Sequence, residues 1–256
     1  MTFILHRGGR EVTCEELAVV PTPAATRTWQ PIPHADLVAG VRSALLSAGA
    51  TIARENHGLS ADGAKYFGTL VLGTEQAHYR TIIGLRNSHD MTFPAGFACG
   101  ANVFVCDNLS FSGEIKLARK HTVHIHRDLP RLIAAAIGKL GSMQAAQDHR
   151  FTAYNTHVID AAHGPAGSTP DQVSDGLIMQ AYRAGVIASS NIGQVLQEWD
   201  RPELPAFRES PRNLWRLFNA FTSVLTPRIA TADLVRRTIA LQGILDVYAG
   251  LTVQAA

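Results

Sequence analysis

Apolar residues recur with two different periods along the chain, and the change of period separates its two halves. In residues 36–48 the apolar positions fall every three or four residues, which predicts an amphipathic helix that ends at Gly49. A second helix is expected to begin near Asp128, with Pro130 in its first turn. Between them, short runs rich in strand-forming residues are separated by turn sequences, which predicts antiparallel hairpins over residues 51–55, 65–72, 78–86 and 101–106.

The second half has helical periodicity throughout. Thr169 is followed by Pro170 and, three residues on, by Gln172, which is a strong signal for the start of a helix. Ser190 is expected to cap the next helix, and apolar stripes predict further helices over residues 214–225 and 234–248. The sequence therefore predicts an α+β fold: an N-terminal helix, antiparallel β-hairpins and a helix, followed by an all-helical C-terminal half.

Prolines and glycines divide the predicted elements into three regions. Four prolines between Pro21 and Pro33 oppose a helix there, so residues 1–33 are expected to form an extended arm. Residues 34–150 are expected to form the α+β core. After the loop sequence of residues 164–168, residues 169–256 are expected to form a helical region that packs on the core or makes a subdomain.

Composition excludes several classes of protein without choosing a function. The chain has 256 residues, 46% of them hydrophobic, and a net charge of +2, which argues against a disordered chain, a collagen and a coiled coil. No run approaches the roughly 20 apolar residues of a membrane helix, so we expect no membrane partner. The three cysteines are too scattered for a disulfide framework, which favours a cytoplasmic location.

Polar residues gather at the ends of two predicted strands. Arg86, Asn87, Ser88, His89 and Asp90 end one strand, and Cys106, Asp107 and Asn108 end the next. If the turn between these strands is centred near residue 95, Arg86 lies opposite Cys106 and both clusters share one end of a hairpin. Such residues also bond their own backbone in turns, so the clusters are either a functional site or a set of turn locks.

Residues 115–131 carry the strongest local charge bias. They include Lys116, Arg119, Lys120, Arg127 and Arg131, together with His121, His124 and His126, against Asp128. Such a strip can neutralise phosphates, or it can be a solvated basic loop. Aromatic residues for base stacking are few, with Phe104 and Phe111 as the nearby candidates.

Catalytic and metal chemistry are alternatives that the motifs do not favour. His124 and His126 would share a strand face, and His89, Asp90 or Cys106 could complete a metal site, but no recognised zinc spacing is present. We therefore expect no metal and no cofactor. Catalytic candidates are His89, Asp90, Cys106 and His121, with Cys106 as a nucleophile and a histidine as its base. No phosphate loop, Gly-x-Ser-x-Gly or Gly-x-Gly-x-x-Gly motif occurs.

Several longer motifs resemble a known family. They are LRNSHD at residues 85–90, VFVCDNLSFSG at 103–113, ARKHT at 118–122 and LWRLFNAFT at 214–222. These stretches are similar to a family of phage- and plasmid-associated proteins classed as a domain of unknown function, over roughly residues 30–250. The resemblance implies a role in replication, recombination or counter-defence. The order of elements is also loosely similar to the core of single-strand annealing recombinases, which bind single-stranded DNA in a basic groove and form rings.

The leading hypothesis is that the chain is a nucleic-acid-binding protein of a phage or plasmid, such as a factor that binds or anneals single-stranded DNA. It is also expected to form homo-oligomers. Its candidate contacts are Arg86, Asn87, Asn108, Lys116, Arg119, Lys120, His121 and Arg127. One alternative is a counter-defence protein that binds a host protein through its helical half. The other is a His/Asp/Cys enzyme that uses the catalytic candidates, with or without a metal.

Overall fold

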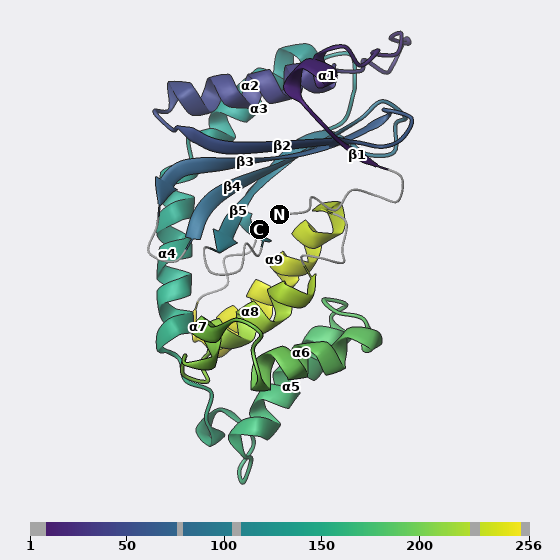
Figure 1. Cartoon of the computed structure of the whole chain (residues 1–256). Helices are drawn as coiled ribbons and strands as arrows, with labels where there is room; N and C mark the ends of the chain where they lie inside the picture. Colours follow the sequence, from purple (N-terminus) through teal and green to yellow (C-terminus); the bar gives the residue numbers. More distant parts are fainter. Residues whose placement is uncertain (1–8, 76–78, 104–108, 226–230, 252–256) are drawn as a thin grey trace.

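The computed structural model of the chain describes residues 9–75, 79–103, 109–225 and 231–251. Within this part, six strands form one antiparallel sheet whose order follows the chain (Figure 1). The strands are β1 (Arg10–Val12), β2 (Ile52–Leu59), β3 (Lys65–Glu75), β4 (Tyr79–Ser88), β5 (Ala95–Val103) and β6 (Leu109–Arg119). Together with helices in both halves, this sheet confirms the predicted α+β class and its helical C-terminal half.

One face of the sheet is covered by helices from the first half of the chain. These are α1 (Cys14–Ala18), α2 (His34–Ser47) and α3 (Ile125–Ile137), which lie above the sheet in Figure 1. Leu37 of α2 and Ile133 of α3 belong to one buried cluster with Ile83 of β4 and Phe97 of β5. Alternate residues of a strand point to opposite faces, so the residues between these, such as Ile82, face the other layer.

The opposite face packs against helices of the second half. Their bounds are α4 (Leu140–Thr156), α5 (Pro170–Arg183), α6 (Ile192–Asp200), α7 (Pro205–Arg208), α8 (Leu214–Leu225) and α9 (Thr231–Tyr248). In Figure 1, α4 descends past the end of the sheet and α9 crosses beneath it. The hydroxyl of Thr238 on α9 accepts a hydrogen bond from the backbone N–H of Phe111 on β6, at 2.9 Å. Sheet and helices here share one buried core, so the helical region packs on the α+β core.

Several sequence predictions are confirmed closely. The helix predicted over residues 36–48 is α2, and the strands predicted over residues 51–55 and 65–72 are the antiparallel pair β2 and β3. Thr169 and Gln172 form the expected capping box at the start of α5. The cap assigned to Ser190 was wrong, because residues 189–191 form a short 3₁₀ turn and Asn191 precedes α6.

The arm predicted over residues 1–33 is partly folded. Strand β1 and helix α1 occupy residues 10–18, where Thr13 and Glu16 form a capping box. The prolines that argued for an extended arm begin only at Pro21, and residues 21–33 contain no helix or strand. No helix in the part of the chain that the structure describes has the length and hydropathy needed to cross a membrane.

The register of β4 and β5 overturns the expected hairpin. Arg86 pairs with Gly96 rather than with Cys106, because β5 begins at Ala95 and its turn spans residues 89–94. Strand β5 is rich in small residues rather than in β-branched and aromatic side chains, so the sequence pattern did not predict a strand that begins at residue 95. Gly96 and Gly100 are needed there, since a Cβ at either would clash with the backbone of β6. The cluster of residues 86–90 therefore lies next to the start of β5, and residues 106–108 lie outside the described residues.

Candidate functional site

A cleft opens between the sheet and the first turns of α9. Its volume is about 370 Å³, and its lining includes Phe67 of β3, Arg86 of β4, Lys116 of β6, and Asp233 and Arg236 of α9. Phe67 pairs with Arg86, and Lys116 pairs with Ala98 of β5, so these side chains come from neighbouring strands and share the face that α9 crosses. This is a common size for a small-ligand site.

Arg86 is a half-buried cation on the wall of this cleft. Its guanidinium carbon lies 5.6 Å from the centre of the Phe93 ring, and Phe93 in turn lies 5.3 Å from Phe67, centre to centre. No carboxylate in the described residues pairs with Arg86. Burial lowers the pKa of Arg86 below its usual value, although an arginine remains protonated at neutral pH. A desolvated cation of this kind is stabilised by an anion.

The remaining charges of the cleft are also mainly positive. Lys116 is exposed, and no described carboxylate forms an ion pair with it. Arg236 and Asp233 are both exposed and lie 3.9 Å apart, which is a weak surface pair. With Arg86, the cleft thus has three cations and one carboxylate among its described residues, so it favours an anionic ligand.

Asn87 lies at the centre of a buried polar network rather than at the surface. Its amide nitrogen donates to the carbonyl of Ile32 at 2.8 Å and to Nδ1 of His34 at 2.9 Å. Nε2 of His121 donates to the Asn87 carbonyl oxygen at 2.8 Å. Nε2 of His89 donates to the same carbonyl of Ile32 at 2.8 Å. Asn87 therefore joins β4, the segment before α2 and the segment after β6.

The network holds His34 and His121 in the neutral form. Burial, aided by the neighbouring His89, lowers the pKa of both His34 and His121 to about 4. His34 stacks on His89 with ring centres 3.8 Å apart, so a charge on one ring disfavours a charge on the other. The prediction that Asn87 and His121 contact nucleic acid is therefore corrected: both side chains are buried and already hydrogen-bonded.

The basic strip of residues 115–131 does not form one surface. Lys116 and Arg119 point to opposite faces of β6 because they are three positions apart along the strand. Asp128 accepts from Arg119 at 2.7 Å and from Arg127 at 2.9 Å, so both arginines are paired. Lys120 is exposed. Among the described basic residues of the strip, Lys116 is the one that lines the cleft.

The structure does not bring together the other predicted catalytic and metal residues that it describes. Asp90 is exposed, accepts from the backbone and hydroxyl of Thr92, and pairs with Lys65 at 3.3 Å, so it locks the turn. His89 bonds to Ile32 instead of Asp90. His124 and His126 lie at the start of α3, not on a strand face as predicted. Cys106, Asp107 and Asn108 lie outside the described residues, as does Phe104, and Phe111 is buried.

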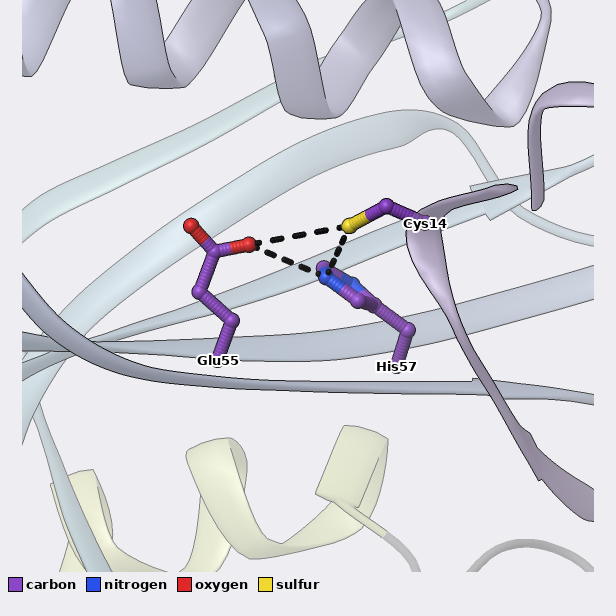
Figure 2. Close-up of side chains that lie close together, drawn as sticks. All are labelled: Cys14, Glu55 and His57. Atoms are coloured by element: carbon purple, nitrogen blue, oxygen red, sulfur yellow. Dashed lines mark hydrogen bonds and ion pairs between the residues drawn. The ribbon is translucent and has the colours of Figure 1, made fainter. Parts of the chain in front are cut away.

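A second cluster, which the sequence did not reveal, joins α1 to β2. Figure 2 shows Cys14, Glu55 and His57 with their polar atoms pointing toward one another. Nε2 of His57 lies 3.2 Å from Sγ of Cys14 and 3.1 Å from Oε2 of Glu55. Sγ of Cys14 lies 3.9 Å from Oε2 of Glu55. Glu55 and His57 face the same side of β2 because they are two residues apart, whereas Cys14 is about forty residues away in sequence.

Two further side chains complete the surroundings of this cluster. The guanidinium of Arg42 on α2 donates to both carboxylate oxygens of Glu55 and to Sγ of Cys14. Burial raises the pKa of Glu55, but Arg42 and His57 outweigh it and the net pKa is lowered. Nδ1 of His57 lies 2.8 Å from the hydroxyl of Tyr66, whose pKa burial raises well above 10. Glu55 is therefore ionised and Tyr66 neutral near pH 7.

Comparison with protein-family models, with curated proteins and with solved structures finds no match to this chain.

Proposed function

We propose that the protein binds single-stranded nucleic acid in the cleft between the sheet and α9. The observation that carries this proposal is Arg86, a half-buried guanidinium without a carboxylate partner in the described chain. Placing a phosphate there would supply the missing anion, and a guanidinium can donate two parallel hydrogen bonds to it. Lys116 and Arg236 would interact with the phosphates on either side.

The aromatic side chains beside Arg86 favour a nucleic acid over a free anion. Phe93 is half-buried and contacts both Arg86 and Phe67, and Phe67 lines the cleft, so a base entering the cleft would meet an aromatic ring next to the phosphate site. Unpaired bases stack on such rings, whereas the bases of a duplex are already stacked on each other. A cleft of about 370 Å³ is suited to a nucleotide of a single strand.

Binding of single strands would serve the recombination or replication of a phage or plasmid, in which the protein would anneal complementary strands. The family resemblance of the LRNSHD and ARKHT motifs supports this part of the proposal, since both motifs contribute residues to the cleft or border it. The network around Asn87 then has a positioning role: it fixes the end of β4, and with it the backbone of Arg86, through His34 and His121.

The first experiment is fluorescence anisotropy of a labelled single-stranded oligonucleotide, titrated with the full chain at several salt concentrations. Three phosphate contacts predict that log K falls with log salt with a slope of about −2, since each contact on a single strand contributes about −0.7. A duplex of the same sequence is expected to bind more weakly. Flat anisotropy at low salt, or equal affinity for the duplex, would contradict the proposal. A strand-annealing assay then tests the biological activity.

A further inference from the structure

We propose that Cys14, Glu55 and His57 form a binding site for a zinc ion. This site lies on the opposite face of the sheet from the cleft and does not depend on the proposed function. The three residues offer a thiol, a carboxylate and an imidazole, and the three ligand atoms all lie within 4.8 Å of one another.

The spacing of the ligand atoms fits a tetrahedral ion. With Zn–S near 2.3 Å and Zn–N and Zn–O near 2.0–2.1 Å, tetrahedral geometry separates the ligand atoms by about 3.3–3.6 Å. In the structure the three separations are 3.2, 3.1 and 3.9 Å. A zinc ion could therefore be bound with side-chain adjustments of a few tenths of an ångström, and a water molecule would complete the tetrahedron.

The ligand set also selects the kind of metal. Thiolate and imidazole ligands favour zinc and other late transition metals, whereas Mg²⁺ and Ca²⁺ require sites made of oxygen atoms. With two of three ligands being sulfur and nitrogen, the cluster is poorly suited to the hard cations. Since the ligands come from α1 and β2, a bound ion would hold α1 against the sheet.

The orientation of His57 is fixed as in established zinc sites. A histidine ligand usually donates its second ring N–H to a neighbouring group, which sets the tautomer and aims the ring. Nδ1 of His57 lies 2.8 Å from the hydroxyl of Tyr66, so Nε2 is left to face Cys14 and Glu55. Tyr66 is buried, and Gly68 leaves the space for its hydroxyl, which a Cβ at that position would occupy.

Arg42 is the cation that a metal must displace. Its guanidinium bonds to Glu55 and lies 2.9 Å from Sγ of Cys14. Arg42 therefore contacts two of the three side chains that would bind zinc. The Arg42 side chain is partly exposed, so it can move toward solvent when an ion enters. A zinc ion bound by Glu55 and Cys14 would lie close to the Arg42 guanidinium, and the two cations would repel each other. Removal of Arg42 is therefore expected to raise the affinity for zinc.

The experiment uses the full chain, freed of metal and kept reduced, and titrates it with Co²⁺ as a spectroscopic probe. Cobalt with a thiolate ligand in a tetrahedral site gives a sulfur-to-metal charge-transfer band and intense d–d bands. We expect these bands to saturate at one equivalent, and Zn²⁺ to remove them by competition. Absence of the thiolate band in the wild-type protein would overturn the proposal.

Variants assign the site to its residues. Cys14→Ser is expected to remove the charge-transfer band and to weaken zinc binding by about tenfold or more, whereas the buried Cys99→Ala serves as the matched control and should keep both. Arg42→Met is expected to bind zinc more tightly than the wild type. An unchanged band in Cys14→Ser, or weaker binding by Arg42→Met, would overturn this account of the site. Circular dichroism confirms that each variant is folded.

Discussion

The guanidinium carbon of Arg86 on β4 lies 5.6 Å from the ring centre of Phe93, which lies in the turn between β4 and β5. Among the described residues, this cation–π contact is the interaction that the Arg86 guanidinium makes. It leaves the N–H donors of the guanidinium available to a ligand. A cation–π contact contributes about 0.5–2 kcal/mol, less than a charge-assisted hydrogen bond pair to a phosphate. The contact with Phe93 therefore orients the Arg86 side chain without neutralising its positive charge.

Replacement of Asn87 by alanine is expected to destabilise the protein strongly. The change removes the hydrogen bonds to Ile32, His34 and His121, and it leaves a buried ring N–H without an acceptor. Each unsatisfied buried group costs about 1–3 kcal/mol, so we expect a loss of about 3 kcal/mol in the free energy of unfolding. Urea denaturation measures it. Asn56→Ala is the control, since Asn56 makes a single bond of 3.3 Å to Thr69 and should cost under about 1 kcal/mol.

Acid is expected to destabilise the protein through the same network. Burial lowers the pKa of His34 and His121 to about 4 in the folded state, while the usual value is 6.5. Between pH 6.5 and 4 the unfolded chain therefore binds more protons than the folded chain. The stabilisation is present above pH 6.5 and is lost as the pH falls toward 4, by at most about 1.4 kcal/mol per pH unit for each group.

Denaturation at several pH values tests this dependence. In His121→Gln, one of the rings whose pKa is lowered is gone, so the slope between pH 6.5 and 4 should become smaller. His149 is exposed on α4, and His149→Gln should keep the wild-type slope. Equal slopes in wild type and His121→Gln would show that His121 does not contribute.

The fold could be predicted where periodicity and capping were strong. The stripe of α2 and the capping box of Thr169 and Gln172 gave correct helices, because local sequence alone specifies them. Strand β5 was placed six residues too late, since its alanines and glycines are chosen for close packing against β6 rather than for strand propensity. Helix α1 was missed because a short capped helix has too few residues for a periodic pattern.

The candidate sites were harder to predict because they depend on distant pairings. Arg86 and Lys116 were identified as candidates, but Phe67, Phe93 and Arg236 join them only through the register of the sheet and the position of α9. Asn87 and His121 look like surface binding residues in sequence, and burial decides otherwise. Cys14 and His57 have no spacing motif, so their proximity follows only from the docking of α1 on β2.

Replacement of Gly68 by alanine tests the packing beneath Tyr66. A Cβ at this position would clash with the Tyr66 hydroxyl, which is fully buried and bonded to His57. Overpacking of this kind costs about 1–3 kcal/mol, which thermal or urea unfolding can measure. Gly176 lies in the middle of α5 with open space around it, so Gly176→Ala should instead raise the stability by about 1 kcal/mol. A neutral Gly68→Ala would show that Tyr66 is free to move.

Arg119 is expected to act on stability and not on binding. Its ion pair with Asp128 connects the end of β6 to α3, and it points away from the face that carries Lys116. Arg119→Gln should lower the free energy of unfolding by at most about 1 kcal/mol. Its affinity for a single-stranded oligonucleotide should stay within about twofold of wild type, apart from a small general effect of net charge. A tenfold loss would place the nucleic acid on the α3 side of the sheet.

The central claim is that Arg86 binds a phosphate of a single strand in the cleft. The most direct measurement compares the anisotropy titrations of Arg86→Gln and Arg131→Gln, since both remove one positive charge and Arg131 is exposed on α3, away from the cleft. We predict that Arg86→Gln weakens binding by about tenfold and makes the salt slope shallower by about 0.7, while Arg131→Gln changes little. Equal affinities and slopes for the two variants would contradict the account.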